Sequence, residues 1–255
     1  MKNNTHHFID LLLIMTEKEL KARYKNTIFG FLWLFVNPLL QMLIIGFVFT
    51  FFMKEPIKNY NYYLFTNLLV WNFFSTSLSK ATPSIVFERS LIKKAKFPHT
   101  IIPISIILSN LVHLLAALSL FMIPVIFIKT LSISRIPYLI PAFILLISFT
   151  VGLSLLTSAL NVRFRDVAFF IQALLIIWFY ATPIVYSFYI IPYQYIWLWR
   201  LNPMTSVLQL FQHAFINYPL PGVAMITVNT FMIIIISVLG ILIFKKESKN
   251  FDDWL

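Results

Sequence analysis

Nucleophilic and ionisable side chains are few in this sequence, and their spacing limits the chemistry that they could perform. The 255 residues include nine Asp and Glu, five His and no Cys, which removes thiolate nucleophiles, thiolate metal sites and disulfides. His6 and His7 are adjacent, so they do not share one helix face as a pair of metal ligands would. The phosphate-binding pattern GxxxxGK[ST] is absent. We therefore expect no catalytic residue, metal site or bound nucleotide on this chain, and any ATP-derived energy must come from another subunit.

The carboxylates are also poorly placed for general acid–base catalysis. Three of the nine fall in the last nine residues, and the others are spread along the chain. Asp166 stands beside Arg165 and close to Arg163, and we expect it to form an ion pair with one of them. A membrane-embedded glycosyl- or acyltransferase would need acidic residues or histidines clustered at the membrane surface. An enzyme is therefore the less favoured alternative.

The composition is that of a polytopic membrane protein. Hydrophobic residues make up 60% of the chain and charged residues 11%, and the mean hydropathy is +0.84. A β-barrel would need a polar residue at every second position to line its interior. The apolar runs here show no such alternation, so the sequence predicts membrane-spanning helices.

Six apolar runs are long enough to cross a bilayer, which takes about 20 helical residues. They cover residues 31–53, 62–78, 101–128, 136–160, 167–186 and 223–244. An even number of spans puts both termini on one side. Loops on that side carry 15 Lys and Arg against five on the other, so both termini are predicted to be cytoplasmic. The net charge of +11 then reflects orientation and attraction to anionic lipid headgroups, without a role for nucleic acid.

The six runs contain no Asp, Glu, Lys or Arg. Ion-coupled transporters usually carry carboxylates near the middle of the membrane, so ion coupling is disfavoured. His113 is the one histidine within a run. We expect it to form a hydrogen bond between helices rather than to act in a proton relay.

A charged segment, residues 16–26, leads directly into the first apolar run. At about 100° per residue, apolar side chains fall on one side of a helix and basic side chains on the other. The apolar side comprises Ile9, Leu12, Leu13, Thr16, Leu20 and Tyr24, and the basic side comprises Lys18, Lys21, Arg23 and Lys25. We predict an amphipathic helix at the membrane surface, in contact with lipids. The alternative is a solvated basic flank that only sets the topology.

Residues 83–98 (PSIVFERSLIKKAKFP) form a cytoplasmic loop between prolines. Solvated lysines would explain its charges but not its apolar residues, which gain free energy by docking on another surface. The loop therefore predicts a short helix beneath the membrane that contacts a protein partner. Its charged residues are Glu88, Arg89, Lys93 and Lys94.

The external connection, residues 186–222, is too long and too apolar for a free loop. Asn202 followed by Pro203 is a typical helix start, with Asn as the cap and Pro in the first helical position. We predict two re-entrant half-helices, which must pack against protein or face water. Aromatic residues are dense in the first part and include Tyr186, Tyr189, Tyr193 and Trp197. They could line a translocation path, since aromatic faces stack on sugar rings; the alternative is an ordinary interfacial belt.

Four stretches resemble those of type-2 ABC exporter permeases, the group that moves O-antigen, capsular and teichoic-acid polymers across the bacterial cytoplasmic membrane. They are LKARYKNTIFGFLWLFVNPLL at residues 20–40, SLIKKAKFPHTIIPIS at 90–105, NVRFRDV at 161–167 with WFYATPIVY at 178–186, and LNPMTSVLQLFQ at 201–212. Their order and spacing cover nearly the whole chain. Together they are fairly specific for the family and much less so for its substrate.

The resemblance implies an all-α polytopic membrane protein of the bacterial inner membrane. It would be one permease domain over residues 1–255, with an interface segment (1–30), a six-helix membrane region (31–244) and a cytoplasmic tail (245–255). Two permeases would form a homodimeric channel for a lipid-linked polysaccharide. Two separate ABC ATPase subunits beneath them would bind ATP and Mg.

The resemblance also implies roles for particular residues. The charged residues of the cytoplasmic loop, Glu88, Arg89, Lys93 and Lys94, fall in the ATPase-coupling region, and Asn202 and Pro203 fall in the outer gate. Relatives often carry an acidic and a basic residue after the NP motif, but this chain has Gln209 and Gln212, which puts a gate salt bridge in doubt. A drug or small-lipid exporter of the same build is the nearest alternative. A non-catalytic scaffold would predict no transport defect on deletion.

Overall fold

The computed structural model describes residues 2–25, 27, 29–52, 57, 59–94, 97–127 and 132–254. Throughout these residues the regular structure is helical, with no strand, which confirms the all-α fold class. Each predicted apolar run overlaps one long helix, and several of these helices extend beyond their run. These helices are α2 (Trp33–Phe52), α3 (Tyr60–Phe87), α5 (Ile101–Phe127), α6 (Leu139–Arg163), α7 (Asp166–Tyr180) and α10 (Val223–Glu247).

The remaining elements are short, apart from the N-terminal helix α1 (Lys2–Tyr24). The short α-helices are α4 (Arg89–Lys94), α8 (Ile196–Arg200), α9 (Pro203–Ile216) and α11 (Phe251–Trp254). Single 3₁₀ segments cover Gly30–Leu32, Ile133–Tyr138, Phe188–Ile190, Tyr193–Tyr195 and Ser248–Asn250.

Three of the described helices are both long enough and apolar enough to cross a membrane. They are α5, α6 together with the 3₁₀ segment before it, and α10. α2 and α7 are shorter apolar helices, and α3 carries several polar residues. The count of six spans therefore stays a prediction. Residues 53 and 128, expected to end two spans, lie outside the described residues, as do Lys54, Lys58, Lys96 and Lys129 of the charge count.

The fifth apolar run ends earlier than predicted. Helix α7 stops at Tyr180, and Ala181 to Tyr186 form turns instead of the last helical turns of the span. The cause is local, because Pro183 disfavours the helical conformation of Thr182 before it. The backbone carbonyls freed by this break are used by other helices: Tyr63 Oη donates to the carbonyls of Pro183 and Tyr186, at 3.0 and 2.8 Å.

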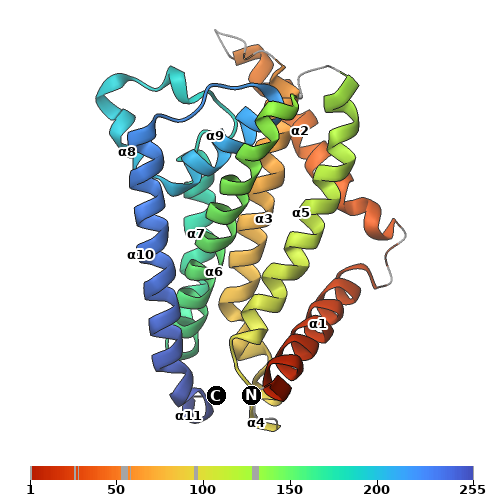
Figure 1. Cartoon of the computed structure of the whole chain (residues 1–255), viewed down its shortest axis with the longest axis vertical. Coiled ribbons are helices and arrows are strands. Elements are labelled where there is room, and N and C mark those ends of the chain that lie inside the picture. The colour runs from red at the N-terminus through yellow and green to blue at the C-terminus, as the bar shows by residue number, and fades with distance from the viewer. Residues whose placement is uncertain are drawn as a thin grey trace.

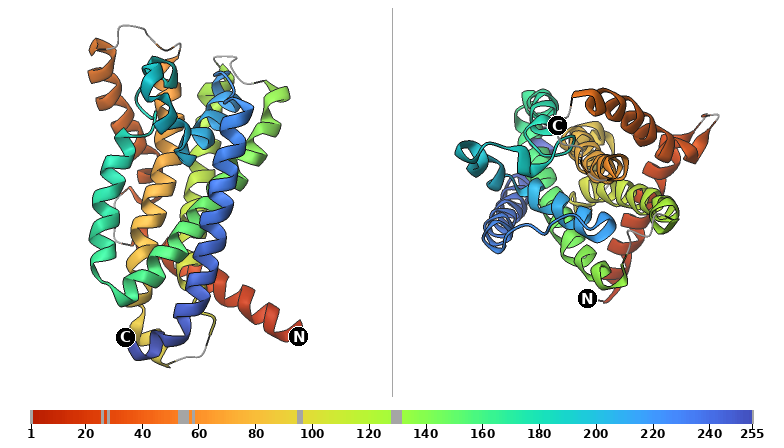
Figure 2. Two further views of the ribbon diagram at one scale, coloured as in Figure 1. Left: turned by 90° about the vertical axis from the view of Figure 1, so that its left-hand side faces the viewer. Right: turned by 90° about the horizontal axis from the view of Figure 1, so that it is seen from above.

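The long helices form an upright bundle in which α3 packs against α2, α5, α6, α7 and α9. Figure 1 shows both chain termini at one end of this bundle, beside α4 and α11, and shows α8 and α9 at the opposite end. Figure 2 (left) shows α1 sloping outward from the end that holds the termini. The predicted coupling loop and the predicted gate thus lie at opposite ends.

Helices α6 and α10 approach each other most closely at two glycines. A Cβ atom built on Gly240 would lie 2.0 Å from the carbonyl oxygen of Gly152, and one on Gly152 would lie 2.4 Å from the Cα atom of Ser237. Ser237 Oγ also donates to the carbonyl of Ser148 at 2.9 Å. Small residues that let backbones meet, joined by a serine hydrogen bond, are typical of helix contacts in membranes.

The last residues of the chain are packed, although the sequence predicted only a cytoplasmic tail there. Phe251 is fully buried, with ring contacts to Phe244 of α10 and His99 before α5 at centroid distances of 5.5 and 5.7 Å. The same apolar cluster includes Met15 of α1 and Ile92 of α4. One cluster thus holds α1, α4 and the C-terminal segment together.

Candidate functional site

The predicted N-terminal helix is present as α1, and Arg23 departs from the predicted division of its two faces. Met15 and Thr16 are buried, whereas Ile9 and Leu13 from the predicted apolar side are 47% and 59% exposed. Arg23, predicted on the basic side, turns into the bundle. The reason is angular: Arg23 follows Thr16 by seven residues, which returns a helix to nearly the same face.

Two buried side chains of α5 hold Arg23. Its Nη2 donates to Asn110 Oδ1 at 2.5 Å, and its Nη1 donates to Nδ1 of His113. Asn110 and His113 are 2% and 4% exposed. The expected hydrogen bond of His113 between helices is therefore confirmed, and its partner comes from α1.

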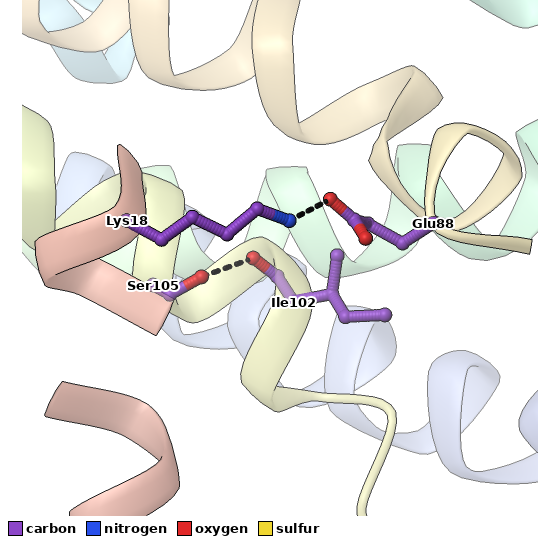
Figure 3. Close-up of polar contacts among 4 residues, drawn as sticks. All are labelled: Lys18, Glu88, Ile102 and Ser105. Atoms are coloured by element: carbon purple, nitrogen blue, oxygen red, sulfur yellow. Dashed lines mark hydrogen bonds and ion pairs between the residues drawn. The ribbon is translucent and has the colours of Figure 1, made fainter. Parts of the chain in front are cut away.

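The other basic residues of α1 face outward. Lys21 contacts Glu17 at 2.5 Å, and this hydrogen bond to the ammonium group lowers the pKa of the Glu17 carboxyl. Lys18 Nζ lies 2.6 Å from Glu88 Oε1, in the turn between α3 and α4 (Figure 3). Lys25 is exposed. The Lys18–Glu88 ion pair joins the interface helix to the predicted coupling region, although an exposed pair contributes at most about 1 kcal/mol.

The predicted coupling region contains a helix of only six residues, α4, after a single turn at Glu88. Helix α3 continues through Pro83 to Phe87, so the predicted separate helix starts later than its first proline suggested. Ile92 is buried and anchors α4, while Arg89, Lys93 and Lys94 are exposed on it. The arrangement presents three cations at the end of the molecule that holds both termini.

The predicted ion pair of Asp166 is wrong. The structure describes all of residues 161–167 and shows no salt bridge of Asp166 there. Asp166 stands in the first turn of α7, where the helix dipole favours a negative charge. The Arg163 guanidinium lies over the rings of Phe164 and Trp254, at 5.1 and 5.8 Å.

Asn202 organises the opposite end of the molecule. Its Oδ1 caps α9 by accepting from the Met204 backbone N–H at 3.1 Å, with Pro203 in the first turn, as predicted. The same oxygen accepts from Trp178 Nε1 at 3.0 Å, and Asn202 Nδ2 donates to Thr182 Oγ1 at 2.8 Å. One side chain thus joins α9 to the end of α7.

Helix α9 is buried along its length, as expected of a re-entrant helix that packs against protein. Gln212 Nε2 donates to Asn67 Oδ1 at 2.8 Å, and Asn67 Nδ2 donates to the carbonyl of Ile184 at 2.9 Å. Neutral amides thus link α9 to α3 where a salt bridge was in doubt. The first predicted half-helix is present only as 3₁₀ turns and the five-residue α8.

The four candidate aromatic residues fall into different environments. Tyr189 and Trp197 line a pocket of about 490 Å³ together with Arg200 and Gln209. Tyr186 has a structural position, with its Oη donating to the carbonyl of Tyr180 at 2.8 Å and accepting from Trp199 Nε1 at 2.7 Å. Tyr193 is 86% exposed. The structure therefore brings two of the four into one pocket and leaves Tyr193 outside it.

Sequence reasoning missed the polar residues that complete this end, above all Asn67 in α3 and Asn229 in α10. Asn229 is fully buried and donates to Ser206 Oγ at 2.6 Å and to the carbonyl of Asn202 at 3.3 Å. An Asn within an otherwise apolar run was the available signal, because a buried amide needs a partner. Among the described residues, no three His, Asp or Glu gather closely enough to hold a metal ion.

The Asn202 network supports a stability prediction. We expect Asn202→Ala to lower the free energy of unfolding by about 1–3 kcal/mol, because it removes a helix cap and leaves buried partners without a hydrogen bond. Thermal unfolding of the purified protein in detergent measures this. Gln194→Ala, an exposed amide in the same connection, is the control and should leave the melting temperature unchanged. Equal melting temperatures for the two variants would contradict the prediction.

Comparison with known proteins defines the class. The ABC-2 type transporter family matches residues 10–216, so the chain belongs to this family of membrane transporter subunits and is not an enzyme. The chain is also similar over its full length to two O-antigen export system permease proteins RfbA from Klebsiella pneumoniae. Each is 34% identical and covered over 98% of its length. An O-antigen export system permease protein RfbA from Myxococcus xanthus is 33% identical, over 85% of this chain and 84% of its own.

Proposed function

We propose that this chain is the membrane-spanning subunit of an ATP-driven exporter that moves a lipid-linked polysaccharide of the O-antigen type across the bacterial cytoplasmic membrane. The observation that carries the proposal is the full-length similarity to permeases named for O-antigen export. Capsular or teichoic-acid polymers would make the same demands on the path. A long polymer does not fit inside a closed cavity, so two copies of the chain, each a single permease domain, enclose a continuous channel.

The cytoplasmic side of the proposed exporter is the end with α4 and the termini. Two ABC ATPase subunits that bind ATP and Mg sit beneath it and contact the turn at Glu88 and the cations of α4. Support comes from the position of α4 beside both termini (Figure 1) and from the exposure of its cations, Arg89, Lys93 and Lys94. The ion pair of Glu88 with Lys18 then carries movement of α4 to the interface helix.

The exit side of the proposed exporter is the end with α8 and α9. Asn202 and Pro203 position α9 as part of the outer gate, and the pocket of Tyr189 and Trp197 offers aromatic faces beside the amide of Gln209. This combination suits a carbohydrate, which stacks on aromatic rings and forms hydrogen bonds with amides.

The aromatic pocket can be separated from an interfacial belt. We expect Trp197→Ala and Tyr189→Ala each to reduce polymer at the cell surface several-fold, because the pocket loses a stacking face. Tyr193→Ala is the control, since this exposed side chain lies outside the pocket. Surface polymer is measured by immunoblotting of intact cells at matched permease levels. If all three variants export normally, the residues act as a belt.

The proposal as a whole is tested by deleting the gene and complementing it. Loss of surface polymer, with polymer accumulating inside the cell, is the expected result. A photoreactive residue at Lys93 should capture a nucleotide-binding ATPase in native membranes. Normal surface polymer after deletion would point to a scaffold. Normal polymer with an altered response to drugs or small lipids would point to an exporter of the same build with another substrate.

A further inference from the structure

A polar cavity of about 440 Å³ lies among α2, α3 and α5, beside the end of α1. Its lining includes two cationic side chains, Arg23 from α1 and Lys80 from α3, which approach from different elements. The cavity lies apart from the aromatic pocket at the exit end and has no role in the proposed gate.

The Arg23 guanidinium is held in a fixed orientation in this cavity. Two of its hydrogen bonds go to uncharged acceptors on α5, Asn110 Oδ1 and His113 Nδ1, and both of these residues are buried. Glu19 of α1 lies near enough to Lys80 to act on its charge, but it does not line the cavity.

Amide side chains form the wall between α2 and α3. Asn72 Nδ2 donates to Gln41 Oε1 at 3.0 Å, and Gln41 Nε2 donates to Asn37 Oδ1 at 3.4 Å. These side chains add neutral hydrogen-bonding groups to the lining of the same cavity. A set of cations and amides around one space is suited to the oxygens of a phosphate, which accept several hydrogen bonds at once.

The lining of the cavity also includes apolar side chains. Trp33 is one of them; it is 43% exposed and packs edge-on against Phe29 at a centroid distance of 5.7 Å. Beyond Trp33, α2 exposes a row of aliphatic side chains at Leu40, Leu43 and Ile44. A polar chamber beside an exposed apolar helix face matches a ligand with an anionic headgroup and a long hydrocarbon chain.

We propose that this cavity binds the phosphate of a lipid through Arg23 and Lys80, while the lipid chain runs along the outer face of α2. In the exporter this lipid is the carrier of the polymer, a step that rests on the proposed function. Arginine binds phosphate oxygens in a fork, and lysine adds a second positive charge. The cavity would therefore hold the end of the substrate where sugar and lipid are joined.

The test uses the permease with its ATPase subunits in phosphatidylcholine nanodiscs. A trace of polyprenyl phosphate with a photoreactive group next to the phosphate is irradiated, and labelled peptides are mapped by mass spectrometry. We expect label on the segments of α2, α3 and α5 that line the cavity. An excess of unlabelled polyprenyl phosphate should abolish it, whereas neutral polyprenol should not.

Variants assign the label to the two cations. Arg23→Gln and Lys80→Gln should each reduce labelling about tenfold, the effect of losing one charge-assisted hydrogen bond. Lys21→Gln removes the same charge from α1, but its side chain is 76% exposed and pairs with Glu17, so labelling should stay at the wild-type level. Because Arg23 also holds α1 against α5, Lys80→Gln is the decisive variant. Wild-type labelling in Lys80→Gln, or label mapped outside the cavity, would overturn the proposal.

Competition identifies the source of the phosphate. If unlabelled polyprenyl phosphate reduces photolabelling much more strongly than phosphatidic acid does, the bound phosphate belongs to the carrier lipid. If the two lipids reduce photolabelling equally, that assignment is overturned in favour of bulk lipid. Inorganic phosphate that competes as well as either lipid overturns the lipid site. Photolabelling is measured independently of export. If the protein exports polymer but takes up no photolabel in the cavity, only the cavity proposal is rejected. If the cavity is labelled but the protein is dispensable for export, only the proposed function is rejected.

Discussion

Gly240→Ala is expected to destabilise the protein by about 1–3 kcal/mol, the usual cost of forcing an extra methyl group into a packed interior. The new Cβ would lie 2.0 Å from the Gly152 carbonyl oxygen, and this obstacle is backbone, which has no rotamer to change. Helices α6 and α10 would have to separate, which would also strain the Ser237–Ser148 hydrogen bond. Because little hydrophobic driving force joins helices within lipid, the loss of close packing is not offset by other contacts.

The chain offers a matched control for this substitution. Gly222 lies directly before α10, but a Cβ there meets nothing within 4 Å and its φ of −59° suits alanine. Gly222→Ala should therefore leave stability unchanged or raise it slightly by restricting the unfolded chain. Thermal unfolding in detergent compares both variants with the wild type. If the Gly240→Ala and Gly222→Ala proteins have the same melting temperature, α6 and α10 adjust to the added methyl group without loss of stability, which would contradict the prediction.

The features that sequence predicted well are local. The start of α9 follows from two neighbouring residues, because Asn202 caps and Pro203 has the right φ for a first helical residue. The six apolar runs locate the long helices because span length and hydropathy are properties of contiguous residues. Even the error at the end of α7 had a local cause, since Pro183 was available to predict it.

The features that sequence missed depend on partners far along the chain. Gln212 meets Asn67 across 145 residues, and Gly240 meets Gly152 although α7, α8 and α9 lie between them in the chain. Neither spacing has a periodic signature. Phe251 is similar: as one of two aromatic residues in a charged tail, it gave no sign that it would be buried against His99. Arg23 differs from these. It follows Thr16 by seven residues, which is nearly two helical turns, so its position on the same face as Thr16 could have been predicted from the sequence.

Reversing the charge of the predicted coupling helix, with Lys93→Glu and Lys94→Glu together, is expected to abolish most polymer export while the permease remains folded. Both side chains are exposed, and within the described residues neither takes part in a salt bridge. Surface substitutions of this kind change stability by about 0.5 kcal/mol or less. Burial of Ile92 keeps α4 attached to the cluster around Phe251.

The expected loss arises at the interface with the ATPase. A surface that meets two lysines would meet two carboxylates instead, and like charges brought together across an interface cost several kcal/mol. We expect surface polymer to fall more than about tenfold, which corresponds to about 1.4 kcal/mol. ATP hydrolysis by the ATPase subunits should continue, now uncoupled from export. The measurements are surface polymer in cells and ATPase activity of the purified complex.

Two other lysines provide the control that separates docking from net charge. Lys245 and Lys246 are exposed at the end of α10, on the same end of the molecule as α4, and their reversal changes the total charge by the same amount. Normal export in Lys245→Glu/Lys246→Glu, beside failed export in the α4 variant, would place the contact at α4. Equal loss in both would instead indicate a general electrostatic effect on this side of the membrane, and normal export in both would remove α4 from the coupling path.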